Sequence, residues 1–243
     1  MYASIQLRDV EHIAINQDSS ANLWNKIGYT LSKKPEINFV INKLKNKKKR
    51  DNVLEELEKN IGKDFKGKIH NIEHHLAHLS SAYHVSPFDK SVIVSVDGFG
   101  DFASAAWGFG NQEKITMDGK IFFPHSLGIF YQAMTQWLGF NNYGDEYKVM
   151  GLAAYAKDQY IREPLEIFRN TYGLVNGQFC VLTEIKNHYQ YFKKRLEGYR
   201  FDAIAGALQA WVEEILVEFV TYWIKQTSIR KVVFSGGVAL NIK

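Results

Sequence analysis

The chain has 243 residues, of which 46% are hydrophobic and 23% are charged, and this balance is typical of a globular protein with a buried core. The single cysteine, Cys180, excludes a disulfide framework and a cysteine-based zinc site. The sequence has no basic-then-apolar signal pattern and no uninterrupted apolar stretch near 18 residues, so we expect a cytoplasmic chain without a membrane span.

The formal charge of +4 depends on one segment of the chain. Residues 43–50, KLKNKKKR, contain six basic residues, and without them the formal charge would be −2. Such a run can bind nucleic acid or acidic lipid, or it can be a solvated helix face or loop. Because a nucleic-acid footprint needs a folded basic patch and not only a run, we expect a solvated segment and no nucleic-acid partner.

In chain order, the hydrophobic pattern predicts strands, helices and hairpins. We expect helices at 22–31, 35–62, 72–84, 126–140, 145–156 and 202–228, the fifth after a short loop. We expect strands at 10–16, 66–72, 91–96, 102–110 and 231–235. Two hairpins are predicted, one with a glycine turn within 97–101 and one through Asp118–Gly119. Hairpins followed by helices, and a strand that leads into a glycine turn, indicate an α/β fold with a mixed sheet.

Four of the eight histidines lie within residues 72–84, at positions 74, 75, 78 and 84. His74 and His78 are four residues apart, so on a helix their imidazoles lie on one face and can reach one metal ion. Two ligands make a weak site, so a carboxylate from elsewhere in the chain is required. The peptidase pattern is absent, because no glutamate follows His74 or precedes His78 directly. The alternative is a helix whose histidines are surface or capping residues.

Two glycine motifs are further candidates for a binding site. In VDGFGDFAS, Asp97 ends a buried strand before Gly98 and Gly100, where a carboxylate can bind a metal and backbone N–H groups can bind phosphate. The alternative for this motif is a plain hairpin turn. In FSGGVALN, Gly236 and Gly237 join a strand to a helix start, which suits a phosphate or an adenosine but also any strand-to-helix turn.

Two single positions complete the candidates. Lys148, close to Glu146 in a glycine-flanked segment, can pair with a phosphate as a point charge, or it can belong to a solvated loop. His125, beside a proline in FPHSLG, can act as an acid or base, although most single histidines do not.

Taken together and in this order, six segments resemble the O-carbamoyltransferases of nodulation and antibiotic biosynthesis, over roughly residues 8–241. They are EHHLAHLSSAYHVSPFD, VSVDGFGD, FPHSLGIFYQAMTQWLGF, YKVMGLAAYA, DAIAGALQAWVEE and FSGGVALN. The resemblance implies a Kae1-like domain of the actin, sugar kinase and Hsp70 fold, built from two ribonuclease-H-like lobes with mixed sheets and flanking helices. Residues 1–87 would be the remainder of the first lobe and 88–243 the start of the second, with the fold incomplete at both ends.

The resemblance also implies an activity in two steps. A YrdC-type domain makes carbamoyl adenylate from carbamoyl phosphate and ATP, and the Kae1-like domain passes the carbamoyl group to a hydroxyl of a sugar or natural product. His74, His78 and Asp97 would bind a divalent metal, Fe(II) first and Mn(II) or Mg(II) as alternatives. The residues expected to contact the nucleotide are Gly98, Gly100, Glu146, Lys148, Gly236, Gly237 and Asn241. His125 would lie on the substrate side, and no catalytic base is assigned.

The family's first motifs, a further metal-binding aspartate and the YrdC-type domain fall outside these 243 residues. We therefore expect a missing domain or a partner chain to make the adenylate, and a metal that binds weakly to this chain. Two alternatives remain open. The chain can be a non-catalytic nucleotide-binding module or split subunit, or a protein of the tRNA threonylcarbamoylation type in which residues 43–50 would hold RNA.

Overall fold

The computed structural model describes residues 6–33, 53–61, 65–183, 185 and 187–241. The basic run at 43–50 and most of the helix predicted at 35–62 therefore lie outside the described residues. The chain divides into two compact units, Met1–Ala77 and His78–Lys243, which are described separately. The correspondence of these two units to the two predicted lobes stays a prediction.

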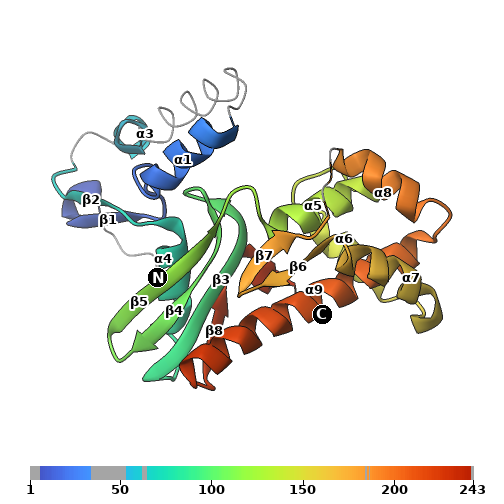
Figure 1. Cartoon of the computed structure of the whole chain (residues 1–243). Coiled ribbons are helices and arrows are strands. Elements are labelled where there is room, and N and C mark those ends of the chain that lie inside the picture. The colour runs from blue at the N-terminus through green and yellow to red at the C-terminus, as the bar shows by residue number, and fades with distance from the viewer. Residues whose placement is uncertain (1–5, 34–52, 62–64, 184, 186, 242–243) are drawn as a thin grey trace. The chain divides into compact units, whose positions relative to one another are not determined.

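The first unit contains a short parallel ribbon and helices (Figure 1). Strand β1 (His12–Ile15) pairs in parallel with β2 (Lys68–Asn71), with Ile13 opposite Ile69, so both predicted strands are confirmed. The other elements are the 3₁₀ helix η1 (Leu7–Asp9), α1 (Leu23–Lys33), α3 (Val53–Ile61) and the first turn of α4 (His74–Tyr83). The predicted helices at 22–31 and 72–84 are confirmed, and α3 is the described part of the helix at 35–62.

The second unit is organised around a four-stranded sheet of order β5-β4-β3-β8 (Figure 1). The strands are β3 (Lys90–Gly100), β4 (Ala103–Asn111), β5 (Lys114–Phe122) and β8 (Val232–Ser235). Neighbours β3–β4 and β4–β5 are antiparallel, whereas β3 and β8 are parallel. The mixed sheet confirms the predicted α/β class, while the assignment to the actin-like fold stays a prediction.

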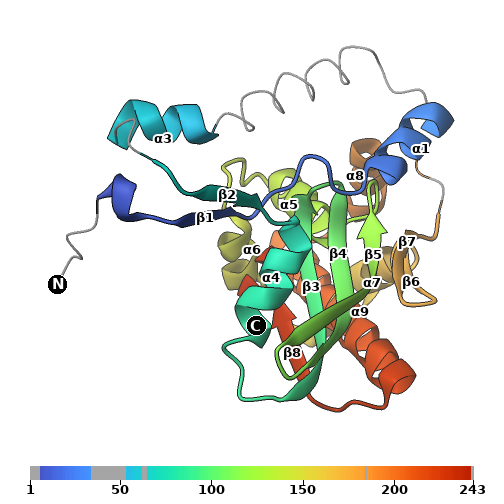
Figure 2. The same ribbon diagram turned by 90° about the vertical axis from the view of Figure 1, so that its left-hand side faces the viewer.

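Helices cover both faces of this sheet, because β3 has apolar side chains on both faces. Side chains alternate along a strand, so Val92, Val94 and Val96 enter the main core with α5 (Leu127–Trp137) and α9 (Phe201–Thr227). Ile93 points to the opposite face and packs against Leu79 of α4. Figure 2 shows α4 on one side of the sheet and α9 on the other. The continuous apolar run of β3 is therefore the consequence of burial on both faces.

The remaining helices confirm three predictions, and the structure adds elements that were not predicted. Helices α5 and α9 lie where expected, and α6 (Glu146–Ala153) follows its loop. The additional elements are α7 (Asp158–Arg169), the hairpin β6 (Tyr172–Val175) and β7 (Gln178–Val181), and α8 (His188–Leu196). Asn176 and Gly177 both have positive φ between β6 and β7, so the Asn-Gly pair was a readable hairpin signal. In the described part of the chain, no helix is long and apolar enough to cross a membrane.

The first predicted hairpin is confirmed, but the turn is not where the glycines are. Asp101 and Phe102 make the turn between β3 and β4, with φ of 48° and 76°. Asp97 and Gly98 remain inside β3, where the register shifts just after Val96. The expectation of a sharp glycine turn directly after Asp97 is therefore wrong. The strand continues past Asp97 to Gly100, with an irregularity in its pairing with β4 between Val96 and Gly100.

The second predicted hairpin, through Asp118–Gly119, is wrong. Strand β5 is unbroken, and the turn before it lies at Gln112, with φ of 54°. Trp107 pairs with Gly119 while the next residue of β4 pairs with Met117, so Asp118 forms a bulge. A Cβ on Gly119 would collide with the Trp107 ring, so this glycine is required by packing and not by a turn.

The glycine pair at the end of β8 behaves as expected for a turn. Gly236 has φ of 93°, in the left-handed region that favours glycine. The helix start predicted after it is the short 3₁₀ helix η2 (Gly237–Leu240). Because β8 and β3 are parallel neighbours, this turn and Asp97 lie at the same end of the sheet.

Candidate functional site

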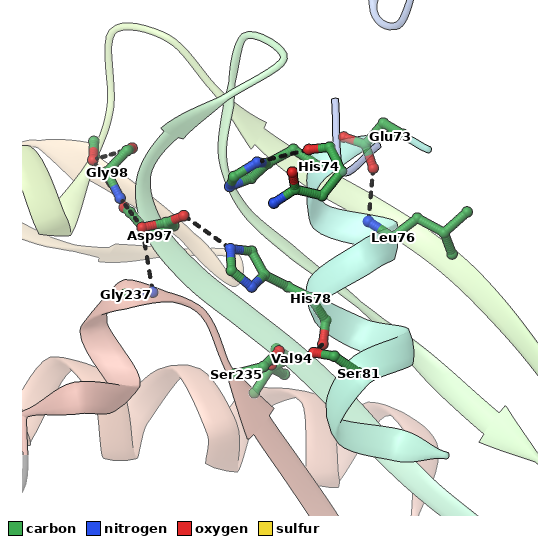
Figure 3. Close-up of polar contacts among 12 residues, drawn as sticks. Glu73, His74, Leu76, His78, Ser81, Val94, Asp97, Gly98, Ser235 and Gly237 are labelled. Carbon is green, nitrogen blue, oxygen red and sulfur yellow. Dashed lines mark hydrogen bonds and ion pairs between the residues drawn. The ribbon is translucent and has the colours of Figure 1, made fainter. Parts of the chain in front are cut away.

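Helix α4 carries the histidine pair of the candidate site. His74 and His78 are one turn apart on this single helix, and the boundary between the two compact units falls between them. His78 Nε2 lies 3.0 Å from Asp97 Oδ2 (Figure 3). His74 Nδ1 lies 3.3 Å from the backbone oxygen of Asn16. One potential ligand atom from each of His74, His78 and Asp97 lies within 4.8 Å of the other two. The three residues named from the sequence are thus brought together.

Backbone N–H groups orient the Asp97 carboxylate. Its Oδ1 accepts hydrogen bonds from Gly98 N at 2.8 Å and from Gly237 N at 3.2 Å (Figure 3). Its Oδ2 faces His78. One oxygen is thus held by the ends of two neighbouring strands, while the other is directed towards the histidines. A side chain of which 21% is exposed remains accessible to a ligand.

The donor set fits a divalent metal ion. Two imidazoles and one carboxylate are a common set for Zn²⁺, Fe²⁺ or Mn²⁺, and three protein ligands leave positions for substrate. Metal–nitrogen and metal–oxygen bonds of ~2.0–2.2 Å place neighbouring ligand atoms ~3 Å apart. The 3.0 Å between His78 Nε2 and Asp97 Oδ2 therefore suits a shared ion as well as a hydrogen bond. Helix α4 and β3 thus supply three side chains of the types that bind divalent metal ions.

Ser126 contacts the backbone of β3 beside Asp97 through its hydroxyl, and it was not among the predicted site residues. Its buried Oγ donates to Gly98 O at 2.7 Å and lies 3.2 Å from Asp97 O. The same Oγ accepts from Ile129 N at 3.1 Å and so caps the start of α5. A serine directly before a helical apolar pattern was the signal that could have identified it.

The predicted glycines divide into two groups. Gly98 and Gly237 donate to Asp97, and Gly236 allows the turn that brings Gly237 there. A Cβ on Gly237 would lie 2.6 Å from Asp97 Oδ1, so a side chain there would displace the carboxylate. Gly100 pairs with Ala103 at the closed end of the β3–β4 hairpin. Three of the four glycines thus lie around Asp97, whereas Gly100 belongs to the β3–β4 hairpin.

Lys148 is held by a local ion pair on α6. Its Nζ lies 2.7 Å from Asp145 Oδ1, and it stands over the Phe140 ring at 5.8 Å from the centroid. The hydrogen bond from Lys148 lowers the pKa of Asp145, and the same bond raises the pKa of Lys148. Glu146, also predicted to contact the nucleotide, lies partly buried at the start of the same helix. The ammonium is therefore a positioned charge and not a freely moving one.

His125 and Asn241 are the remaining predicted residues. Burial lowers the pKa of the His125 imidazole, which favours the neutral form near pH 7. Its buried Nδ1 has no hydrogen-bond partner among the described residues, and its backbone oxygen accepts from Ser104 Oγ at 2.5 Å. Asn241 directly follows η2 and pairs with Gln209 of α9 through both side-chain polar atoms. The Asn241 side chain thus faces the protein core.

Comparison with known proteins gives the family. The family model described as Carbamoyltransferase N-terminus matches residues 4–243. The nodulation protein NolNO of Sinorhizobium fredii is 30% identical over 181 residues, which cover 72% of this chain and 26% of that protein. The nodulation protein NolO of Bradyrhizobium diazoefficiens is 31% identical over 183 residues, 70% of this chain and 32% of that protein.

An uncharacterized protein of Methanocaldococcus jannaschii, MJ1051, is 29% identical over 228 residues, 89% of this chain and 43% of that protein. The chain thus spans less than half the length of these curated relatives. Because the family model covers nearly the whole sequence, the chain belongs to the family defined by the carbamoyltransferase N-terminus.

Proposed function

We propose that the chain is the part of an O-carbamoyltransferase that binds carbamoyl adenylate and transfers its carbamoyl group to a hydroxyl of a sugar or natural product. The family supports the reaction class, and two relatives are nodulation proteins by name. The observation that carries the proposal is the Asp97 carboxylate, held by two backbone N–H groups and directed at His78. The adenylate itself would come from a YrdC-type domain or partner that uses ATP and carbamoyl phosphate.

In this proposal, His74, His78 and Asp97 hold a divalent metal, and Fe(II) is the first expectation. When bound, the ion would supply positive charge to phosphate oxygens of the nucleotide. The protein's own contribution is to orient the Asp97 carboxylate, because its Oδ1 accepts hydrogen bonds from two backbone N–H groups. The two N–H donors also stabilise the negative charge of the carboxylate when no ion is bound.

The glycine turn gives the nucleotide close access to the backbone. Gly236 and Gly237 carry no Cβ, so a phosphate can approach the main chain at the end of β8. Gly237 of the same turn donates its N–H to the Asp97 carboxylate. We infer that phosphate oxygens lie between this turn and the histidines, with Lys148 as a further positive charge for the nucleotide.

Transfer requires a deprotonated acceptor. The hydroxyl oxygen of the acceptor forms a bond to the carbamoyl carbon, the bond from that carbon to the phosphate oxygen breaks, and AMP leaves. The hydroxyl proton passes to a base. His125 is our candidate, because its lowered pKa keeps the imidazole neutral and able to accept a proton near pH 7.

Metal titration of the purified chain tests the site. We expect the parent to bind Mn(II), or Fe(II) without oxygen, and the double variant His74→Ala/His78→Ala to bind at least about tenfold more weakly. His84→Ala is the matched control, because His84 lies exposed directly after α4. Equal affinities of the parent and the double variant would exclude these ligands.

Nucleotide binding and transfer separate this proposal from the non-catalytic alternative. With the partner that makes the adenylate, ATP, carbamoyl phosphate and a hydroxyl acceptor, we expect a carbamoylated acceptor that mass spectrometry detects. A complex that forms the adenylate and binds it to this chain, but yields no carbamoylated acceptor from any sugar or natural product supplied, would favour a nucleotide-binding module.

A further inference from the structure

Gln209 is a buried amide in an otherwise apolar stretch of helix α9. Only 3% of the residue is exposed, and Ala207, Leu208 and Trp211 around it belong to the main core. Burial of an amide costs free energy unless its hydrogen-bonding groups are satisfied. We therefore expect the amide of Gln209 to make specific hydrogen bonds that an apolar residue could not make.

All the hydrogen-bonding capacity of the Gln209 side chain is used. Its Nε2 donates to Asn241 Oδ1 at 2.8 Å and to Glu213 Oε1 at 3.0 Å. Its Oε1 accepts from Asn241 Nδ2 at 3.0 Å and from the Tyr131 hydroxyl at 3.2 Å. Two N–H groups and two lone pairs are the complete set that an amide offers.

These partners determine the orientation of the amide. The Glu213 carboxylate accepts and cannot donate, so it selects the Nε2 end of Gln209. Burial, followed by the nearby charges of Glu146 and Glu213, raises the pKa of Tyr131, so its hydroxyl stays protonated and donates to Oε1. With both ends assigned, the Asn241 amide can pair with Gln209 in one orientation only.

We propose that Gln209 is a positioning residue for the candidate metal site, acting through Asn241 and the 3₁₀ helix η2. The expected effect on metal binding rests on the proposed function, whereas the expected effect on η2 can be tested by itself. Asn241 directly follows η2, and its N–H donates to Val238 O. At the other end of η2, Gly237 N donates to Asp97 Oδ1. The amide pair thus anchors the far end of the segment that orients the carboxylate.

Geometry explains why an anchor is needed. Gly236 and Gly237 have no side chains, and a glycine pair has more backbone freedom than other residues. The Gly237 N–H is exposed, so its bond to Asp97 competes with water unless η2 is held in place. Asn241 is 32 residues from Gln209 in sequence, and their paired amides tie η2 to α9, the longest helix described.

The test uses two variants that break the amide pair from opposite sides. Gln209→Glu keeps the side-chain shape but removes the donors to Asn241 and Glu213. Asn241→Ala removes the partner at a partly exposed position, so the core of α9 remains intact. Gln226→Glu is the matched control, because it makes the same change at an exposed position on the same helix. Ile215→Val, buried on α9, controls for a general loss of stability.

Amide hydrogen exchange and metal affinity are the two readouts. We expect the Gly237 amide to exchange at least about tenfold faster in Gln209→Glu and in Asn241→Ala than in the parent, and at the parental rate in both controls. We also expect the two variants to bind Mn(II) about tenfold more weakly, since residues that orient metal ligands affect affinity by 10–100-fold. The double variant should lose no more than either single variant, because both break one pair.

The outcomes separate the two proposals. Unchanged Gly237 exchange in both variants would overturn the positioning role, whatever the metal affinity. Faster exchange with parental metal affinity would also overturn it, because the anchor would then have no effect on the site. If the parent itself binds no Mn(II) or Fe(II), the proposed metal site fails, and with it the functional part of this inference. Should Gln209→Glu fail to fold, Asn241→Ala decides the question.

Discussion

Asp97, near the end of β3, and the glycine turn after β8 lie side by side, yet one contributes a side-chain acceptor and the other a main-chain donor. At the end of β3 a side chain acts: the Asp97 carboxylate faces His78, and Ser126 supports the backbone behind it. At the end of β8 the main chain acts: Gly236 turns in the left-handed region and Gly237 donates its N–H to Asp97. The parallel pairing of β3 and β8 makes this division possible, because both strands end at the same edge of the sheet.

The largest expected effect is that of Gly236→Ala. Its positive φ of 93° and the collision of a new Cβ with Val96 O should together destabilise the chain by about 3 kcal/mol or more. Gly98→Ala is the matched change at the end of β3, where a new Cβ would lie 3.5 Å from Ile129 Cδ1, an ordinary contact. We expect it to cost less than about 0.5 kcal/mol. Urea unfolding measures the free energy of unfolding of both variants. Equal losses of stability would show that the two sites tolerate an added Cβ equally.

Ser126→Ala should have a smaller effect, confined to the end of β3. It removes the hydroxyl that bonds Gly98 O and caps α5 at Ile129 N. Loss of a buried hydroxyl with these partners should cost about 2 kcal/mol in urea unfolding. Gly237 exchange should stay at the parental rate, because η2 is anchored from α9. A strong increase in that exchange would mean that the two strand ends are not supported independently.

The smallest expected effect concerns pH and the segment before Ser126. The pKa of His125 is lowered from its ordinary value of 6.5 in the folded chain, so below pH 6.5 the unfolded chain binds more protons than the folded chain. Stability should therefore fall as the pH falls through the window between 6.5 and the lower folded value. Thermal unfolding of His125→Gln should show a weaker decrease over that window. His84→Gln, at an exposed position, should follow the parent. An unchanged pH profile for His125→Gln would assign the decrease to other groups.

Much of the fold could be predicted because it depends on local patterns. The apolar run at 91–96 predicted β3, and the helical recurrence at 202–228 predicted α9. The candidate ligands His74, His78 and Asp97 were named from helix spacing, a strand end and the family resemblance, and the structure brings them within 4.8 Å. The hairpin β6–β7 was missed although Asn176–Gly177 is a typical turn pair, so that omission was avoidable.

Other features depended on packing between segments that are distant in sequence. Position 119 is a glycine because the Trp107 ring leaves no room for a side chain, so the Asp118–Gly119 pair marks a bulge at Asp118 and not the predicted hairpin turn. Phe102 follows Asp101 in a turn where both have positive φ, a conformation that aspartate tolerates but phenylalanine rarely adopts. Such conformations persist only where the surrounding strands determine them.

The sequence by itself determined most of the helices and strands, and which residues are chemically able to bind a metal and a nucleotide. The reason is that periodicity and residue type are local properties of the chain. Only the tertiary structure decided that Gly237 orients Asp97 and that Gln209 occupies both polar atoms of Asn241. These contacts join residues 140 and 32 positions apart, and sheet order and helix packing bring them together.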